Sequence, residues 1–507
     1  MISIFARHLV SHWLGSRTSS VEYWMSHQEA CQQQVWQTLI QRASSTEWGK
    51  QHDYSRIRSI ADFQQAVPVS EYDDIKHYIA QMLDGKPDVL WRGTTHWFAK
   101  SSGTTSDKSK FIPITADVLK ECHYKAGADS LTRYRQMNPK TGIFSGKGLV
   151  MGGSHQISHH SALSRYGDLS AVLLQNMPWA GQVLRAPRLS IALMDNWEEK
   201  LEAIAQTTIK ENITYLAGVP TWTLLLLRRI RELSGFDDIS QVWKNLELYL
   251  HGGVNFAPYS TQFEQLIPKK TMQYWQTYNA SEGFFGMQED STRNDMMLAA
   301  NHGVFCEFVP LKELSNKYPQ ALLLPEVELN THYALVISTC GGLWRYLLGD
   351  TIVFTSLNPY RIRVSGRTKH FINAFGEELM VDNTDKAIAE ACRQTGARTK
   401  DYTAAPVFMD TNGQRGCHEW LIEFEQEPAD LLQFTQILDR ELQNANSDYE
   451  AKRRGNMVMQ MPLVQSVPTN TFYEWLKSKG KVGGQHKVPR LSNERVHIEE
   501  IKKSFLK

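Results

Sequence analysis

The sequence predicts an α/β protein with two domains, a large one over residues 1–365 and a small α+β domain over residues 366–507. Three observations support this. At 507 residues the chain exceeds the size at which one hydrophobic core usually keeps growing. Between Trp97 and Phe354, helical stretches alternate with short strand-like runs, a pattern typical of βαβ units and mostly parallel sheets. After Asp350 the pattern changes to consecutive strands followed by mixed strands and helices.

The expected elements follow from the spacing of apolar residues, which recur with helical period or in short unbroken runs. Parallel sheets bind ligands beyond the carboxyl ends of their strands, so the loops after strands are where we expect the chemistry. The predicted helices are residues 23–43, 201–210, 222–233, 431–444 and 472–478, and the predicted strands are 213–216, 246–250, 272–277, 351–355, 360–364 and 421–424.

Bulk composition excludes several classes of protein. A formal net charge of +1 argues against a long basic surface for nucleic acid. The six cysteines are scattered without a CxxC pair, which favours reduced thiols and a cytoplasmic location. No apolar run approaches the roughly 20 residues of a membrane-spanning helix. The apolar start, residues 1–14, is interrupted by Arg7 and His8, so we expect a packed amphipathic helix rather than a secretory signal.

A loop rich in hydroxyls suits phosphate binding. Its Ser and Thr side chains, one glycine and two lysines can supply hydrogen bonds and positive charge to phosphate oxygens. The spacing is not that of a Walker A loop. Taken alone, such a loop is more often a solvated turn. The candidate residues are Ser101, Ser102, Gly103, Thr104, Thr105 and Lys110.

Two carboxylates follow predicted strands. Glu282, between Ser281 and Gly283, could hold the magnesium ion that accompanies a nucleotide triphosphate. Asp350, after Gly349, could accept hydrogen bonds from the two hydroxyls of a ribose. Each could equally be an ordinary turn carboxylate.

A glycine-rich segment near the C-terminus carries Lys487 between Gly484 and Pro489. A lysine on a flexible loop can reach an active site and neutralise developing charge. Without the other loops this segment would be interpreted as a surface turn.

Together, these motifs resemble the adenylate-forming superfamily, and more closely the auxin-responsive promoter family of acyl acid amido synthetases. The resemblance covers nearly the whole chain. It rests on the segments Asp62-Phe63, Val67-Pro68-Val69, Tyr72, Phe98, Ser101-Ser102-Gly103-Thr104, Ser281-Glu282-Gly283, Cys306-Glu307-Phe308-Val309-Pro310, Arg345-Tyr346, Gly349-Asp350, Asn446, Tyr449, Arg453 and Gln485-x-Lys487-x-Pro489-Arg490.

The resemblance implies the adenylate-forming fold, ATP and Mg²⁺ as cofactors, and a small carboxylic acid and an amine, such as an amino acid, as substrates. It implies that Glu282 binds Mg²⁺ and that Lys487 meets the acyl-phosphate oxygens. The small C-terminal domain would be mobile and rotate about residues 367–369. The implied nucleotide-binding residues are the phosphate-loop residues named above together with Gly252, Gly253, Val254, Tyr278, Ser281, Asp350 and Arg367.

The acyl pocket is expected within residues 151–179 and 218–222, which follow putative strands and are rich in apolar and aromatic side chains. His155 and His159 are four residues apart, a spacing that could bind zinc on a helix. Gly152 and Gly153 argue for a loop instead. We therefore prefer a polar pocket rim or a buried, hydrogen-bonded histidine.

The chain differs at two positions from the proteins that it resembles. They usually carry glycine at Asp107 and often a basic residue at Leu347. Two other functions stay open. The acyl group could pass to a thiol, as in an acyl-CoA synthetase, or the chain could be a non-catalytic nucleotide-binding protein.

Overall fold

The computed structural model divides the chain into two compact units. The first holds Met1–Leu348 and Val353–Arg363, and the second holds Gly349–Ile352, Val364–Val482 and His486–Lys507. The domain boundary after residue 365 stays a prediction. The structure describes residues 2–101, 110–152, 157–194, 196–253, 256, 259–314, 316, 319–368, 371–372, 374, 377, 379–407, 416–446, 449–450, 453, 459–480, 487–492 and 494–506.

The described residues include an 11-stranded sheet, most of which belongs to the first unit, with the order β12-β13-β14-β15-β11-β10-β9-β8-β7-β3-β6. Its run from β6 to β9 is parallel, as the sequence predicts, and it continues through the antiparallel pairs β9–β10, β10–β11 and β11–β15. The strands are β3 (Lys147–Val150), β6 (Arg185–Ala186), β7 (Ile213–Gly218), β8 (Leu248–Gly252), β9 (Gln273–Ala280), β10 (Gly283–Met287), β11 (Met296–Leu298), β12 (Val304–Pro310), β13 (His332–Thr339), β14 (Tyr346–Leu357) and β15 (Tyr360–Arg367).

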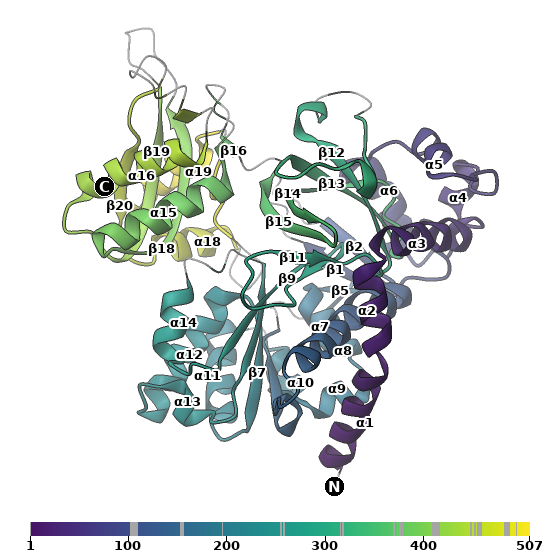
Figure 1. Cartoon of the computed structure of the whole chain (residues 1–507), viewed down its shortest axis with the longest axis horizontal. Helices are drawn as coiled ribbons and strands as arrows, with labels where there is room; N and C mark the ends of the chain where they lie inside the picture. The colour runs from purple at the N-terminus through teal and green to yellow at the C-terminus, as the bar shows by residue number, and fades with distance from the viewer. Residues whose placement is uncertain are drawn as a thin grey trace. The chain divides into compact units, whose positions relative to one another are not determined.

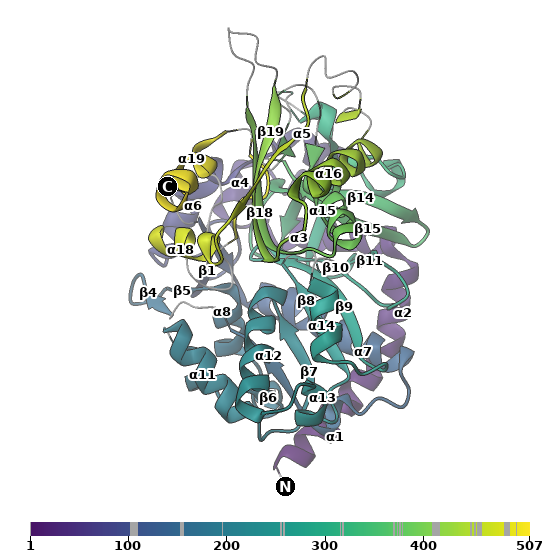
Figure 2. The same cartoon turned by 90° about the vertical axis from the view of Figure 1, so that its left-hand side faces the viewer.

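Helices cover both faces of the parallel strands (Figures 1 and 2). Alternation along β8 explains this, because successive side chains of a strand point to opposite faces. Tyr249 packs with α11, α12 and α14, whereas Leu248 packs with Tyr134 of α7 and with Trp275. The α-helices between residues 124 and 266 are α7 (Tyr124–Met137), α8 (Leu169–Asn176), α9 (Trp179–Val183), α10 (Leu189–Ala192), α11 (Trp197–Thr208), α12 (Pro220–Ser234), α13 (Ile239–Val242) and α14 (Ser260–Leu266).

A second, smaller sheet in the first unit has the order β2-β1-β5-β4 among the described residues. It brings the segment after α6 beside a segment nearly seventy positions further along the chain, because β1 pairs with β5 in parallel. Its strands are β1 (Trp97–Ser101), β2 (Lys110–Ile114), β4 (Ser158–His159) and β5 (Arg165–Gly167).

The N-terminal region is helical, and the expected helix over 23–43 is divided at His27. The backbone of His27 leaves the helical region, with φ −129° and ψ 45°, and its Nδ1 lies 3.0 Å from the Tyr23 carbonyl oxygen. This local side-chain contact competes with continuation of the helix. The helices are α1 (Ile2–Ser16), α2 (Thr18–Ser26), α3 (Gln28–Ala43), α4 (Glu47–Gln51), α5 (Ile60–Ala66) and α6 (Tyr72–Leu83).

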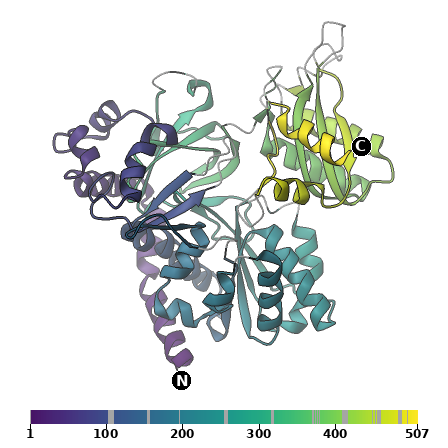
Figure 3. The ribbon, with the colours of Figure 1, turned by 180° about the vertical axis from the view of Figure 1, so that it is seen from behind.

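In the second unit, the described residues include a three-stranded sheet with the order β18-β19-β20. Helices α15 and α16 pack on one face around Trp420, and α18 and α19 pack on the other around Leu421. Figure 3 shows the face with α18 and α19, and Figure 1 shows the opposite one. The elements are β16 (Phe371–Ile372), β17 (Leu379–Met380), α15 (Val381–Thr395), β18 (Arg398–Val407), β19 (Cys417–Gln426), α16 (Leu431–Ala445), β20 (Leu463–Val467), α18 (Thr471–Ser478) and α19 (Val496–Phe505).

Candidate active site

The carboxyl ends of four neighbouring parallel strands lie at one edge of the large sheet. The register pairs Val150 with Ala217, Gly218 with His251, and Gly252 with Thr277. The predicted residues Gly252 and Tyr278 therefore stand at the edge where α/β sheets bind their ligands.

The two glycines after β8 allow a close approach of backbones. A Cβ atom on Gly252 would lie 2.5 Å from the Thr277 carbonyl oxygen and 2.9 Å from the Thr277 hydroxyl. Gly253 has φ +81°, a conformation that favours glycine. The strand ends two residues later than predicted, so Gly252 is its last residue rather than part of a loop. Val254 lies outside the described residues.

His251 forms part of this edge and was not singled out from the sequence. Its side chain is buried, and burial lowers its pKa to about 3. The imidazole stacks on Phe256 with 4.0 Å between ring centroids, and its Nδ1 has no hydrogen-bond partner among the described residues. The His251 ring beside Gly252 is therefore uncharged at ordinary pH.

A tight hairpin carries the predicted metal ligand. Strand β9 runs to Ala280, three residues beyond the predicted end at residue 277, and Ala280 pairs with Gly283. Ser281 and Glu282 therefore form a two-residue turn. The Tyr278 ring is buried, 5.0 Å from the ring of Phe285. This packing fixes the strand from which the half-buried Glu282 emerges.

The base of the predicted phosphate loop is described, although the loop is not. Ser101 ends β1 and pairs with Lys110 at the start of β2, so the antiparallel pair brings the two ends of the loop together. The Lys110 ammonium lies 5.6 Å from the centre of the Tyr72 ring, within cation–π range. Ser102, Gly103, Thr104, Thr105 and the departure Asp107 lie outside the described residues.

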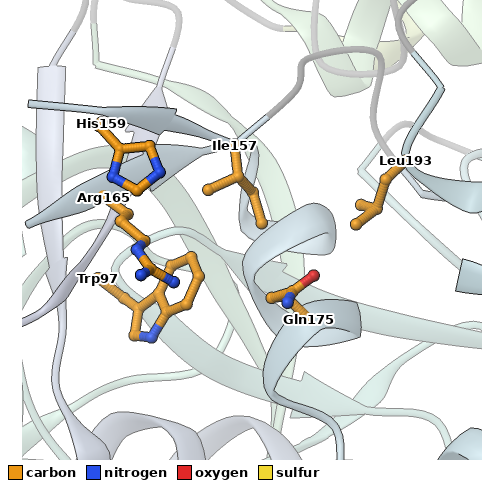
Figure 4. Close-up of a pocket in the computed structure, with 6 residues that line it drawn as sticks. All are labelled: Trp97, Ile157, His159, Arg165, Gln175 and Leu193. Atoms are coloured by element: carbon orange, nitrogen blue, oxygen red, sulfur yellow. The ribbon is translucent and has the colours of Figure 1, made fainter. Parts of the chain in front are cut away.

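An open pocket of about 320 Å³ adjoins the carboxyl end of β3. Gly152, two residues after β3, lies against residues that directly precede two lining residues, because a Cβ on it would lie 2.8 Å from Leu174 of α8 and 2.8 Å from the Ala192 carbonyl oxygen. Four of its lining residues fall within the predicted acyl-pocket segment 151–179. The pocket is lined by Trp97, Ile157, His159, Arg165, Gln175 and Leu193 (Figure 4).

Only one member of the histidine pair lies among the described residues. His159 is exposed and lines the pocket, so of the two preferred interpretations, a polar pocket rim or a buried, hydrogen-bonded histidine, it does not match the buried one. His155 lies outside the described residues, and among those described no three His, Cys, Asp or Glu side chains form a metal-binding group.

In the second unit, Asp350 occupies the interior of a strand instead of preceding one. Strand β14 already begins at Tyr346, and Gly349 adopts φ +86° within it. The Gly349 carbonyl oxygen accepts a hydrogen bond from Thr368 N at 2.8 Å, which fixes the backbone beside Asp350. Only the backbone of Arg367, the last residue of β15, is described.

The segment after Lys487 is attached to strand β18. The Pro489 carbonyl oxygen accepts a hydrogen bond from the Thr403 hydroxyl at 2.6 Å, and Ala404 N donates to the Arg490 carbonyl oxygen at 2.9 Å. The exposed Lys487 therefore extends from a fixed anchor rather than from an isolated surface turn.

Charged side chains also hold this segment against β18. The Arg490 guanidinium lies 3.3 Å from the Asp385 carboxylate and 3.5 Å from that of Asp401, and it stacks 4.4 Å from the Tyr402 ring centre. The Tyr402 hydroxyl donates to Asp385 at 2.7 Å. Burial raises the pKa of Asp401, and the charge of Arg490 opposes that shift. Of these residues, only Arg490 was noted in the sequence. We call Arg490, Asp385, Asp401 and Tyr402 the Arg490 clamp.

Other residues on which the family resemblance rests make structural contacts within their unit. The Arg453 side chain and the Tyr449 hydroxyl both bind Asp439, at 2.6 and 2.9 Å. In the first unit, Arg345 pairs with the buried Glu307 at 3.0 Å. These groups are occupied in structural contacts.

Leu347, the second departure from the relatives, belongs to the scaffold as well. It packs against an apolar cluster that includes Val309 and Val336, and its backbone N donates to the Ser70 carbonyl oxygen at 2.8 Å. The leucine at this position is therefore explained by packing.

Models of the GH3 family match three successive stretches of the chain: the N-terminal domain over residues 17–272, the central domain over 297–367 and the C-terminal domain over 382–496. The indole-3-acetic acid-amido synthetase GH3.3 of Arabidopsis thaliana is 22% identical, with 90% of this chain and 88% of that protein aligned.

Two solved structures extend the comparison. A GH3.15 acyl acid amido synthetase matches with a TM-score of 0.77 at 17% identity, covering 96% of this chain and 95% of its own. A 2-hydroxyisobutyryl-CoA ligase bound to its acyl-AMP matches with a TM-score of 0.56 at 12% identity, covering 97% and 93%. Since the N-terminal family model alone spans half of the sequence, the chain belongs to the GH3 family, and its fold is that of the adenylate-forming enzymes.

Proposed function

We propose that the chain is an acyl acid amido synthetase, a ligase that uses ATP to join a carboxylic acid to an amine, such as an amino acid. The observation that carries this is the edge of the parallel strands. There Gly252, Gly253 and Tyr278 stand on the same edge as the open pocket beside β3, in a chain of the GH3 family.

The chemistry requires two steps. An amine does not displace oxide from a carboxylate, because oxide is too poor a leaving group. In the first step a carboxylate oxygen attacks the α-phosphorus of ATP, and the bond to pyrophosphate breaks. In the second step the amine nitrogen attacks the acyl carbon, AMP leaves with the electron pair, and the amine loses a proton.

The nucleotide would lie against the ends of β8 and β9. Gly252 lies close to Thr277, and Gly253 has a positive φ. A larger residue at either position would cover backbone that the glycines leave exposed. The largely buried rings of Tyr278 and the neutral His251 would border the base. Lys110, at the base of the phosphate loop, would bring positive charge to the triphosphate, and Asp350 would hold the ribose.

The residues present fit a magnesium ion that arrives with ATP. Mg²⁺ usually takes one or two protein carboxylates and completes its shell with water and substrate phosphates. Glu282, half-buried on the hairpin turn, would be such a ligand. The bound ion would offset the negative charge of the triphosphate.

Lys487 would stabilise the charge that develops on the α-phosphate. Its exposed ammonium is carried on a segment that the Arg490 clamp holds at a defined place on β18. Fixed positive charge directed at a developing anion lowers the barrier without reorganisation during the reaction. The same proposal includes a domain boundary after residue 365 and rotation of the second unit. It also includes Arg367 as a nucleotide-binding residue.

The cellular setting is also proposed. All six cysteines are free thiols, as expected in a reducing compartment, and we propose a cytoplasmic enzyme. No helix in the described ranges is long and apolar enough to cross a bilayer.

A substrate screen tests the reaction. The protein is incubated with ATP, a panel of carboxylic acids and either mixed amino acids or coenzyme A, and the products are identified by mass spectrometry. We expect AMP, pyrophosphate and an amide. A thioester without an amide would identify a CoA ligase. Absence of acid-dependent pyrophosphate release across the panel would identify a non-catalytic nucleotide-binding protein.

The ribose assignment has its own test. Asp350→Ala should weaken ATP binding by about tenfold, because hydrogen bonds to a charged group contribute about 1.5–3 kcal/mol. Isothermal titration with ATP measures this, and the circular dichroism melting curve controls for folding. Unchanged ATP affinity would remove Asp350 from the nucleotide site.

A further inference from the structure

The pocket beside β3 contains a cation that no carboxylate among the described residues neutralises. Arg165 lies directly opposite Trp97 in the parallel pair β1–β5 and directly opposite His159 in the antiparallel pair β5–β4. Residues opposite one another across neighbouring strands share a face of the sheet. Trp97, Arg165 and His159 therefore form a row along one wall of the pocket, as Figure 4 shows.

The geometry of the row leaves the guanidinium able to bind an anion. Its central carbon lies 5.6 Å from the centre of the Trp97 ring, so the ring stabilises the positive charge through its face. A guanidinium in contact with a ring face can still direct its N–H groups to another acceptor. Arginine is suited to carboxylates because two parallel N–H groups match two carboxylate oxygens.

The remaining walls favour a flat, apolar body. Ile157 and Leu193 supply aliphatic surface, and Trp97 supplies an aromatic plane, while the Gln175 amide adds a polar group on the side opposite Arg165 (Figure 4). Among the described residues, neither the Gln175 nor the His159 side chain has a hydrogen-bond partner. The pocket thus combines apolar walls with several polar groups at its rim.

None of the residues that line the pocket belongs to β8, to β9 or to the turns that follow them. Strands β3 and β8 are separated by one strand in the sheet, so their ends lie roughly 10 Å apart at two strand spacings of about 4.8 Å. If the nucleotide lies at β8 and β9, the carboxylate to be activated faces that side. Arg165 is then left for a different group of the substrate.

We infer that the pocket selects a carboxylic acid that carries a second anionic group at the far end of a flat, apolar body. This inference rests on the proposed function, because it assigns the pocket to the acid that is activated. Arg165 binds the second anion, Trp97 contacts the body of the acid and orients Arg165, and His159 and Gln175 border the anion.

The α-carboxylate of an acceptor amino acid offers Arg165 the same chemistry. We assign Arg165 to the acid because Trp97, Ile157 and Leu193 form an apolar wall that suits a rigid body larger than an amino acid backbone. The two sources are separable, since adenylation proceeds without an amine and the amine enters only in the second step.

The test compares terephthalate with its monomethyl ester and with benzoate. Acid-dependent ATP–pyrophosphate exchange is measured without any amine for the wild type, Arg165→Gln and Arg165→Lys. We expect the wild-type kcat/KM for terephthalate to exceed that for the ester by about tenfold. Arg165 would make a charge-assisted contact with the free carboxylate, and solvent exposure weakens that contact. Arg165→Gln should abolish this preference and Arg165→Lys should retain part of it. Arg231→Gln, an exposed arginine on the outer part of α12, is the matched control.

The outcomes separate this inference from the proposed function. Equal rates for terephthalate and its ester in the wild type, or a preference that survives Arg165→Gln, would overturn it. Unchanged adenylation with a raised KM for the amino acid would assign Arg165 to the acceptor and also overturn it. If no acid supports exchange, the proposed function fails. Calorimetric titration with terephthalate then tests whether the pocket binds an anion. An affinity that Arg165→Gln reduces about tenfold supports an anion site. Absence of binding, or equal binding by wild type and variant, contradicts one.

Discussion

The strand edge in the first unit and the Lys487 segment in the second position their functional groups by different forces. Around Gly252 the contacts are made by packing, through close backbone approach, a buried neutral histidine and stacked aromatic rings. Around Lys487 they are made by charge, because Arg490 joins the carboxylates of Asp385 and Asp401 to the backbone that carries the lysine.

The two regions should therefore respond to different kinds of substitution. A packed edge is sensitive to added volume and to protonation of a buried ring. A charged clamp is sensitive to the loss of one partner, since the other charge is then left partly buried and unpaired. Substitutions in each region can therefore test whether this division holds.

The largest effect is expected for Lys487→Ala. Removing a fixed charge that stabilises a transition state typically costs about 3 kcal/mol, so the adenylation rate should fall about a hundredfold. The melting temperature should not change, because the side chain is exposed. Stopped-flow measurement of acyl-AMP formation tests this, with the exposed Lys479→Ala, which lies on the surface after α18, as control. Wild-type rates would show that Lys487 has no catalytic role.

The Arg490 clamp should show the next largest effect. Arg490→Met leaves Asp385 and Asp401 without their cation and should lower the free energy of unfolding of the second unit by about 2–3 kcal/mol. Arg490→Lys keeps the charge but not the planar fork, so stability should be partly restored while kcat stays low. Denaturant titration and kcat are compared for both variants. Equal kcat for the lysine variant and wild type would show that the clamp contributes stability only.

The pH dependence of stability tests the packed edge. Burial lowers the pKa of His251 from 6.5 to about 3, so the folded state binds fewer protons than the unfolded state between these values. Stability from this group is complete above pH 6.5 and is lost as the pH falls toward 3. At pH 5 the loss is about 2 kcal/mol. His251→Phe keeps the stacking on Phe256 and should reduce this loss.

Urea titrations at pH 7 and pH 5 measure that difference. His123 is also buried, with its pKa lowered to about 4, so part of the wild-type pH dependence should remain in the variant. The exposed His77→Gln is the control. An unchanged difference between the two pH values in His251→Phe would show that His251 is not held neutral by burial.

The smallest effect is expected from a methyl group. Gly252→Ala places a Cβ within 2.5 Å of the Thr277 carbonyl oxygen, and the required shift should cost about 1–2 kcal/mol and weaken ATP binding. Gly127→Ala in helix α7 is the matched control, because its Cβ would meet no atom within 4 Å. That variant should be stabilised by about 0.5–1 kcal/mol. ATP affinity equal to wild type in Gly252→Ala would contradict the nucleotide assignment.

Local patterns predicted the elements well and their ends less well. Strands β8 and β9 were expected in the correct order, but each continues to a later residue because strand pairing extends the hydrogen-bonded backbone. Asp350 was expected after a turn and lies inside β14 for the same reason. The helix over 23–43 was expected unbroken because apolar spacing does not register the His27 contact with Tyr23.

The sequence by itself determined the residue types and their order: hydroxyl-rich loop, Gly252-Gly253, Glu282, Asp350 and Lys487. These signals are local, since each depends on neighbours within a few positions. Only the tertiary structure decided which distant residues meet. Arg165 faces Trp97 because two strands far apart in sequence pair in parallel, and Arg490 faces Asp385 because the C-terminal segment returns to β18. Long-range pairing leaves no periodic signal at either partner, and so these contacts could be found only in the folded chain.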